Sequence, residues 1–336
     1  MVKRSKSTDN GESQLLLFNP AITRLAESYH QVEGLLLDEA ADGFKEYLRV
    51  FPNDIEVTNA LSSLKWLSRS SLHTENLKQE ELFSWWRKTE RDAARFQILD
   101  TKLYEVLKKG ILQRLVDQMV ADGKKRIRGV HLGILFFELG QYAESIRELR
   151  LATGERPDSS SVLGPLAEAE YRLGQVKKSE TTYALALLYE PLKCGFQEFS
   201  HSDISGVQEK LQSTGMEYEL ARENLLVQCW LEGVLRLAPL PSAVSLHSLV
   251  QQAKELEPEA RIYGRLVLVE DARLFRWCIQ IAEWIRTEAV HLSEEFAWAL
   301  HLMELRDARA FQTYRERLRL EDLQSEETAE FRLGIS

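Results

Sequence analysis

The fold is decided by the stretch from Arg126 to Pro191, which reads RIRGVHLGILFFELGQYAESIRELRLATGERPDSSSVLGPLAEAEYRLGQVKKSETTYALALLYEP. This stretch contains nearly the same pattern twice, and each step between equivalent residues is 34 residues, as from Gly140 to Gly174. The other equivalent pairs are Leu132 and Leu166, Ala152 and Ala186, and Pro157 and Pro191. Self-similarity at this period is typical of a helix-turn-helix repeat. The pattern therefore predicts an all-α chain.

The first copy, residues 126–158, closely resembles the tetratricopeptide repeat (TPR) family. It has a Leu-Gly pair, a large aromatic residue, a Gly-x-Tyr turn, and a closing alanine and proline. The residues that carry this resemblance are Leu132, Gly133, Phe136, Gly140, Tyr142, Ala152 and Pro157. Gly140 is expected to relax the turn between the two helices, because glycine reaches backbone conformations that other residues avoid.

Two further segments follow the pattern with departures. The second copy, Ser160 to Lys193, keeps the turn glycine, Ala186 and Pro191, but has Ala167 for the first glycine and Glu170 for the aromatic residue. Residues 21–54 form a weaker third copy, with Leu35 and Leu37 in place of the Gly/Tyr turn. The resemblance is therefore clear over residues 126–193 and weak over residues 21–54.

Composition limits the class of protein. Apolar residues make up 44% of the 336 residues and charged residues 28%, as in ordered globular chains. A net charge of −9 disfavours nucleic acid as the main partner. Cys194, Cys229 and Cys278 are odd in number and far apart, which favours a reducing compartment, so we expect a cytoplasmic protein. No apolar run is long enough for a secretory signal or a membrane span.

The expected architecture is an α-solenoid of antiparallel helical hairpins, a TPR-like right-handed superhelix with helical extensions. Residues 1–14 are expected to be a disordered leader, and residues 15–122 an N-terminal helical region that contains the weak repeat. Residues 123–193 hold the two TPR-like repeats, and residues 194–320 a C-terminal helical region with capping helices. Residues 321–336 are expected to be an acidic tail. In a solenoid each unit packs against its neighbours, which accommodates a chain of this length.

A search for reaction chemistry finds little. The chain has no phosphate-binding glycine loop, no nucleophile elbow, and no Cys-His or zinc spacing. The best metal candidate is Glu288-x-x-His291 with His301 and Glu304, but a di-iron bundle needs two copies of Glu-x-x-His, and here the second pair is reversed. We therefore expect no enzyme activity, no metal and no cofactor.

The resemblance implies that a ligand lies in a concave groove lined by the first helix of each repeat. The groove positions are Ile127, Val130, Ile134, Phe137 and Glu138, followed by Ser161, Gly164, Glu168, Tyr171 and Arg172. One TPR subclass holds a peptide's C-terminal carboxylate with Lys, Asn and Arg at such positions, but Ile127, Val130 and Ile134 occupy them here.

The groove is thus expected to be apolar, with a charged edge at Glu138, Glu168 and Arg172. This suits an amphipathic helix or an extended apolar peptide of a partner protein, anchored near Phe137 and Tyr171. The alternative is that this face packs against the chain's own terminal helices. The expected function is a scaffold or adaptor that organises a protein complex.

A basic cluster precedes the first clear repeat, and it contains Lys108, Lys109, Arg114, Lys124, Lys125, Arg126 and Arg128. Such a cluster is either a solvated face that balances nearby acids or a contact for nucleic acid or another anionic partner. The alternative function is therefore an accessory or regulatory subunit that uses residues 108–128. The identity of the partner, the pathway and the oligomeric state stay open.

Overall fold

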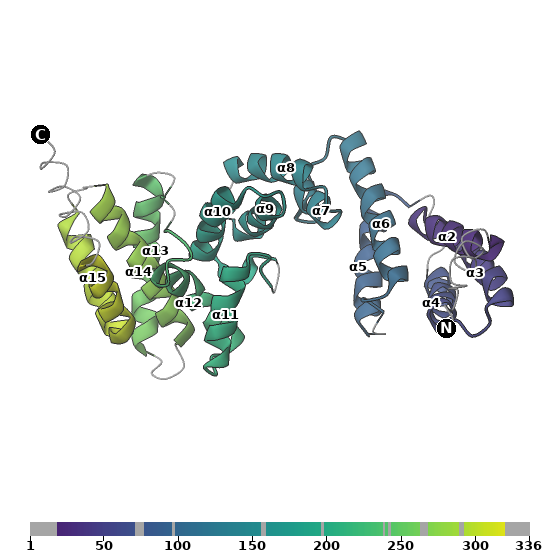
Figure 1. Cartoon of the computed structure of the whole chain (residues 1–336). Coiled ribbons are helices and arrows are strands. Elements are labelled where there is room, and N and C mark those ends of the chain that lie inside the picture. Colours follow the sequence, from purple (N-terminus) through teal and green to yellow (C-terminus); the bar gives the residue numbers. More distant parts are fainter. Residues whose placement is uncertain are drawn as a thin grey trace, which may run out of the picture. The chain divides into compact units, whose positions relative to one another are not determined.

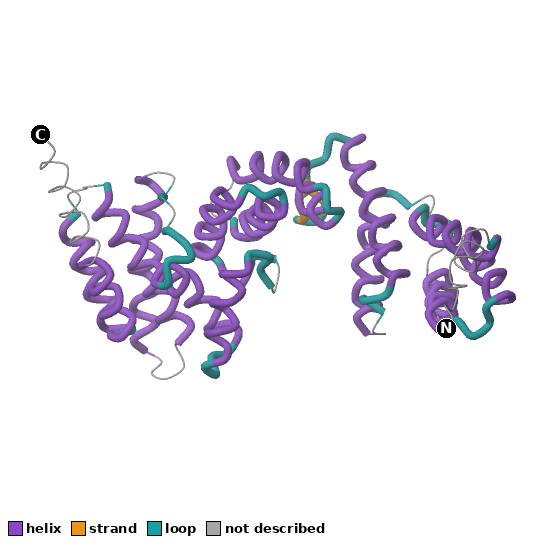
Figure 2. Tube along the Cα trace, viewed as in Figure 1, coloured by secondary structure: helices purple, strands orange, loops and turns teal. Residues whose placement is uncertain are grey.

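The described residues of this computed structural model are almost entirely helical, which confirms the all-α class (Figures 1 and 2). They are residues 19–70, 77–95, 98–155, 159–195, 198–237, 239–240, 243–262, 268–288 and 292–319. The predicted leader, the acidic tail, Pro157 and His291 lie outside them. The chain divides into two compact units, residues 1–140 and residues 141–336. This boundary lies within the segment 123–193 that was expected to hold both clear repeats.

Unit 1 contains the helices α2 (Pro20–Glu33), α3 (Leu37–Val50), α4 (Ile55–Ser70), α5 (Gln79–Arg95), α6 (Lys102–Ala121) and α7 (Leu132–Glu138). Its helices pack around buried apolar side chains such as Phe44, Leu64 and Leu107. The α2 helix contacts both α3 and α6, while α4 packs on α3, and α5 and α7 pack on α6. The side chain of Asn19 accepts a hydrogen bond from the backbone N–H of Ala21, so the start of α2 is capped.

The weak third repeat corresponds to α2 and α3, two consecutive helices in contact with each other. Leu35 stands in their turn with a φ of 62°, in the left-handed region that glycine usually takes. Its side chain is buried, which offsets the backbone strain. The turn is closed by backbone hydrogen bonds from the Leu35 N–H to the Val32 carbonyl and from the Leu36 N–H to the Gln31 carbonyl, so Leu35 takes the place of the usual glycine.

The first helix of the first clear repeat is shorter than predicted. Residues 126–131 form two short strands, β1 (Arg126–Ile127) and β2 (Val130–His131), which pair antiparallel (Figure 2). Arg128 and Gly129 lie between them with φ values of 46° and 86°. Two successive positive φ values are the geometry of a tight hairpin turn, so the helix begins only at Leu132. The prediction that Ile127 and Val130 lie on a helix is wrong.

Unit 2 contains α8 (Tyr142–Glu155), α9 (Ser160–Arg172), α10 (Val176–Tyr189), the 3-10 turn η2 (Pro191–Lys193), α11 (Ser202–Ser213), α12 (Tyr218–Leu231), α13 (Ala243–Ile262), α14 (Leu268–Thr287) and α15 (Ser293–Arg306), and a further helix over 308–319. Consecutive helices pair, with the most extensive contacts between α9 and α10 and between α14 and α15. In addition, α12 packs against both α10 and α14. Buried apolar side chains of α10, α12, α13 and α14 belong to one core.

The second clear repeat has the predicted hairpin of two helices, α9 and α10. Gly174 lies in its turn with a φ of 78°, and Gly140 has a φ of 72°. Both turn glycines therefore have the left-handed conformation that the pattern predicts. Glu170, which replaces the family's aromatic residue, is buried and accepts hydrogen bonds from Arg150 and Thr182 at 2.8 and 2.7 Å.

All three cysteines lie in unit 2, and all three are buried free thiols. Burial raises the pKa of the Cys194 and Cys278 thiols to about 12. Burial also raises the pKa of Cys229. A thiol that keeps its proton is a poor nucleophile, so these cysteines belong to the core of unit 2.

Candidate functional site

The predicted groove positions of the first repeat lie at the end of unit 1. Ile127 is buried on β1, and Val130 is half-buried on β2. Ile134 and Phe137 are half-buried on α7, three residues apart. Glu138 forms an ion pair with Lys108, whose Nζ is 2.6 Å from Oε2. The structure therefore brings Ile134 and Phe137 together, while the acid at this edge already has a basic partner.

Three of the five groove positions of the second repeat are covered by the chain itself. Gly164, Glu168 and Tyr171 share one face of α9, and the backbone of Cys194 leaves no space for a side chain at Gly164. The Glu168 carboxylate is 3% exposed and accepts hydrogen bonds from the Tyr183 hydroxyl at 2.6 Å and the Ser200 N–H at 2.9 Å.

The ring of Tyr171 lies 4.9 Å from the ring of His201, measured between centroids. The segment that follows η2 therefore covers this face of α9, rather than the terminal helices that the alternative named. The Glu168 carboxylate accepts hydrogen bonds from the chain itself, and it does not form the charged edge that the sequence predicted. Ser161 and Arg172 remain exposed.

The basic cluster is balanced by acids of unit 1. Lys108 pairs with Glu138, and Lys109 Nζ lies 2.8 Å from Glu33 Oε1. Arg128 pairs with Glu80 at 2.8 Å, and Lys124 lies 3.5 Å from Asp122. Lys124 also donates a hydrogen bond to Gln79. Lys125 is exposed, and Arg114 and Arg126 are half-buried. Four of these side chains thus have acidic neighbours, the arrangement expected of a solvated face.

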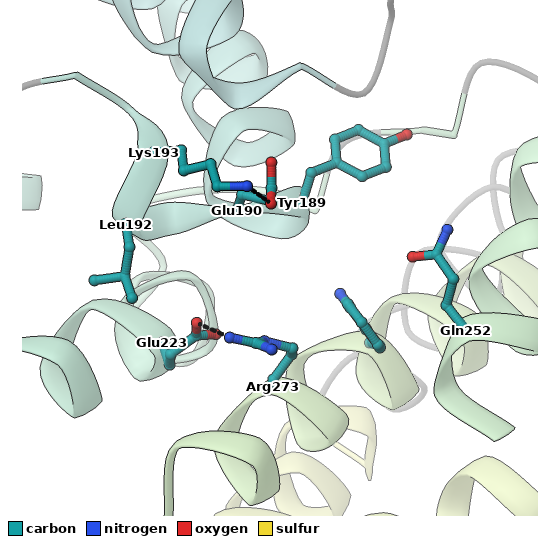
Figure 3. Close-up of a pocket in the computed structure, with 8 residues that line it drawn as sticks. Tyr189, Glu190, Leu192, Lys193, Glu223, Gln252 and Arg273 are labelled. Carbon is teal, nitrogen blue, oxygen red and sulfur yellow. Dashed lines mark hydrogen bonds and ion pairs between the residues drawn. The ribbon is translucent and has the colours of Figure 1, made fainter. Parts of the chain in front are cut away.

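The structure contains a cleft in unit 2 that was not predicted, with a volume of about 430 Å³. It opens where α10 ends, η2 follows, and α12, α13 and α14 pass beneath (Figure 3). The side chains that line it are Tyr189, Glu190, Leu192, Lys193, Glu223, Gln252, Arg273 and Trp277. We call this space the unit 2 cleft.

One side of the unit 2 cleft is built on a buried carboxylate. Glu223 of α12 is 1% exposed, and its Oε1 accepts a hydrogen bond from Arg273 Nη2 at 3.0 Å. Its Oε2 accepts a second hydrogen bond from Arg276, which is fully buried. Arg276 also donates to the backbone carbonyls of Glu223 and Leu188, both at 3.0 Å. These contacts tie α14 to α12 and to the end of α10.

The opposite side carries an exposed ion pair and an aromatic ring. Lys193 Nζ lies 2.5 Å from Glu190 Oε1, with Tyr189 beside this pair (Figure 3). Leu192, 41% exposed, is an apolar side chain at the edge of the cleft. Trp277 donates its indole N–H to the Leu188 carbonyl at 3.2 Å, so its ring is held in place. The cleft thus combines fixed charges with apolar and aromatic surface.

Sequence reasoning missed this cleft because its residues come from four separate helices and a turn. The only local signal is the pair Leu192 and Lys193 directly after the repeat-closing Pro191. Nothing in the sequence pattern links these residues to Glu223, Arg273 or Trp277.

Other kinds of site are not found in the described part of the chain. No group of three or more His, Cys, Asp or Glu side chains among those residues is arranged to hold a metal ion. None of the helices described combines the length and apolar character that a membrane crossing requires.

Comparisons with known proteins return no matching family model, no matching curated protein and no matching solved structure. The likeness to the TPR family therefore depends on the sequence pattern of residues 126–193 and 21–54.

Proposed function

We propose that this chain is a protein-interaction scaffold, built from TPR-like helical hairpins of the α-solenoid kind, that holds a peptide segment of a partner protein. Three features support this role. Consecutive helices pair as hairpins within each unit. The repeat turns at Gly140 and Gly174 have the conformation that the TPR pattern requires. The chain also offers a cleft with the side chains that protein interfaces favour.

The observation that carries the proposal is the composition of the unit 2 cleft. Trp, Tyr and Arg are the residue types that contribute most to binding at protein interfaces, and Trp277, Tyr189 and Arg273 all line the cleft. Hydrogen bonds to Leu188 and Glu223 hold Trp277 and Arg273 in position. A site whose side chains are already ordered loses less conformational entropy when a ligand binds.

The location of the site differs from the groove that the sequence suggested. On α9 the groove face is covered by Cys194, Ser200 and His201, so a partner would have to displace the chain's own segment there. The unit 2 cleft needs no such displacement. The groove residues Ile134 and Phe137 of α7 stay a prediction for a second contact.

The nucleic-acid alternative receives less support from the geometry. A phosphate backbone is attracted by uncompensated Lys and Arg side chains. Lys108, Lys109, Lys124 and Arg128 each lie within ion-pair distance of an acid in unit 1. We therefore favour a protein partner.

The proposal is tested by selecting peptides from a display library on the purified full chain. The selected peptides are then titrated against Leu192→Ser, which removes an exposed apolar side chain from the cleft. Leu192 is 41% exposed, so a bound peptide can bury only that part of the side chain. Losing this burial costs about 0.6–1.2 kcal/mol, so the affinity should fall about three- to sevenfold.

Leu173→Ser is the matched control, because Leu173 is 46% exposed in the same unit and does not line the cleft. It should leave the affinity unchanged. The proposal fails if no peptide is selected, or if the two variants bind every selected peptide equally well.

A further inference from the structure

The unit 2 cleft carries a surplus of positive charge on its Glu223 side. One buried carboxylate, Glu223, lies between two guanidinium groups, Arg273 and Arg276. Burial lowers the pKa of Arg276, but an arginine pKa starts so high that the group stays charged at neutral pH. On the side of the cleft opposite Glu223, the charges of Lys193 and Glu190 neutralise each other. The ionised side chains that line the cleft therefore sum to zero, and the buried Arg276 behind Glu223 adds one positive charge.

The same cluster has more hydrogen-bond donors than acceptors. Both oxygens of Glu223 already accept from a guanidinium group. Arg276 Nη2 is buried without a hydrogen-bond partner in the described structure. Within the described residues, Arg273 donates through Nη2 to Glu223, which leaves Nε and Nη1 for other acceptors. Since the Arg273 side chain is 32% exposed and lines the cleft, these donors can be reached from outside.

We propose that the unit 2 cleft recognises an acidic side chain, Asp or Glu, next to an apolar residue in the partner's peptide, and that Arg273 binds its carboxylate. This inference rests on the proposed function and specifies its ligand. An Arg guanidinium and a carboxylate match in shape and charge and form paired hydrogen bonds. The neighbouring apolar residue packs against Leu192 and the ring of Trp277, which line the same space.

The geometry also explains why Arg273, rather than Lys193, is the residue assigned to the carboxylate. Lys193 is 65% exposed and already has Glu190 at 2.5 Å, so an entering acid competes with an existing partner. Arg273 keeps the hydrogen bond from its Nη2 to Glu223, and its Nε and Nη1 can donate to the carboxylate of the peptide. Glu223 thus orients the guanidinium for an incoming acid.

The test uses the tightest peptides from the display selection, each made with its acid and with the matching amide, Gln for Glu or Asn for Asp. Binding to the full chain is measured by fluorescence anisotropy. Hydrogen bonds to charged groups contribute about 1.5–3 kcal/mol, so the amide peptides and the Arg273→Gln variant should each bind about 10- to 100-fold more weakly. The amide peptide has no carboxylate for Arg273 to bind, so it should bind the wild-type chain and Arg273→Gln equally.

Two variants control for charge and shape. Arg273→Lys keeps the charge but loses the fork of donors, so it should recover only part of the affinity. Arg309→Gln removes an exposed arginine from another helix of the same unit and should change nothing.

Three outcomes would overturn the inference, and the first of them leaves the proposed function standing. If peptides bind in a Leu192-dependent way but tolerate the amide, the acidic specificity is refuted while the scaffold role stands. If sodium glutarate displaces the peptide at concentrations near the peptide's own Kd, the cleft is a site for free carboxylates and the peptide assignment is refuted. If no peptide is selected, both proposals fall together.

Discussion

The substitution Glu223→Gln tests whether the buried charge cluster organises unit 2. It removes one negative charge and leaves the shape of the side chain almost unchanged. Arg276, with none of its surface exposed, then keeps its bonds to two backbone carbonyls but loses the carboxylate that balances its charge. Breaking a buried pair by removing one partner costs about 3–5 kcal/mol, because an uncompensated charge stays buried.

The variant Arg273→Gln, which should lower the stability of unit 2 much less, serves as the comparison. Arg273 is partly exposed, and Glu223 keeps Arg276 when Arg273 is removed. A pair that reaches solvent contributes about 0–1 kcal/mol. For a urea m-value of about 2 kcal/mol/M, Glu223→Gln should lower the unfolding midpoint by about 1.5–2.5 M and Arg273→Gln by less than about 0.5 M.

Thiol labelling measures this transition in unit 2 alone, because the buried cysteines all lie there. Each variant is exposed to a brief pulse of iodoacetamide at increasing urea, and alkylation is followed by mass spectrometry. The double variant Glu223→Gln/Arg276→Met removes both members of the pair and should recover much of the lost stability. Equal midpoints for Glu223→Gln and Arg273→Gln would show that the buried charge cluster does not organise unit 2.

Two further predictions concern the thiols and the basic cluster. The pKa values of the buried thiols are raised above about 8.5, the value of an unfolded thiol. Below pH 8.5 the thiols are protonated in both the folded and the unfolded chain. Above pH 8.5 the thiols of the unfolded chain lose their protons first. The free energy of unfolding should therefore fall between pH 8.5 and 10, by up to about 1.4 kcal/mol per pH unit for each thiol, and urea titrations that show no decline would contradict this. The triple variant Lys124→Ala/Lys125→Ala/Arg126→Ala should leave binding to a 30-nucleotide DNA at low salt as weak as in the wild-type chain, whereas a clear loss of affinity with a reduced salt slope would support the anionic alternative.

The helical hairpins could be predicted from the sequence because their determinants are local. Gly174 marks the turn between α9 and α10, and the apolar spacing around Phe44 marks the segment that forms α2 and α3, two helices in contact. The strand pair at residues 126–131 also had a local signal, since Arg128-Gly129 stands between the β-branched Ile127 and Val130. The 34-residue register predicts helix at these positions, whereas the positive φ values of Arg128 and Gly129 turn the chain into a hairpin instead.

The sites could be predicted less well because they depend on contacts between distant residues. Glu168 was placed at an open edge by register alone, yet Tyr183 and Ser200 close over it. The basic cluster was recognised, but its acidic partners Glu33 and Glu80 lie far away in the sequence. The unit 2 cleft depends on the packing of α12 against α10 and α14, and no periodicity in the sequence reports that packing.

Site-specific photocrosslinking shows whether a partner's peptide occupies the unit 2 cleft. A benzophenone amino acid is placed at position 192 or, as the control, at position 173, and each chain is irradiated with a selected peptide. We expect a crosslinked peptide at position 192 and none at position 173. Equal crosslinking at both positions, or none at position 192, would contradict this expectation.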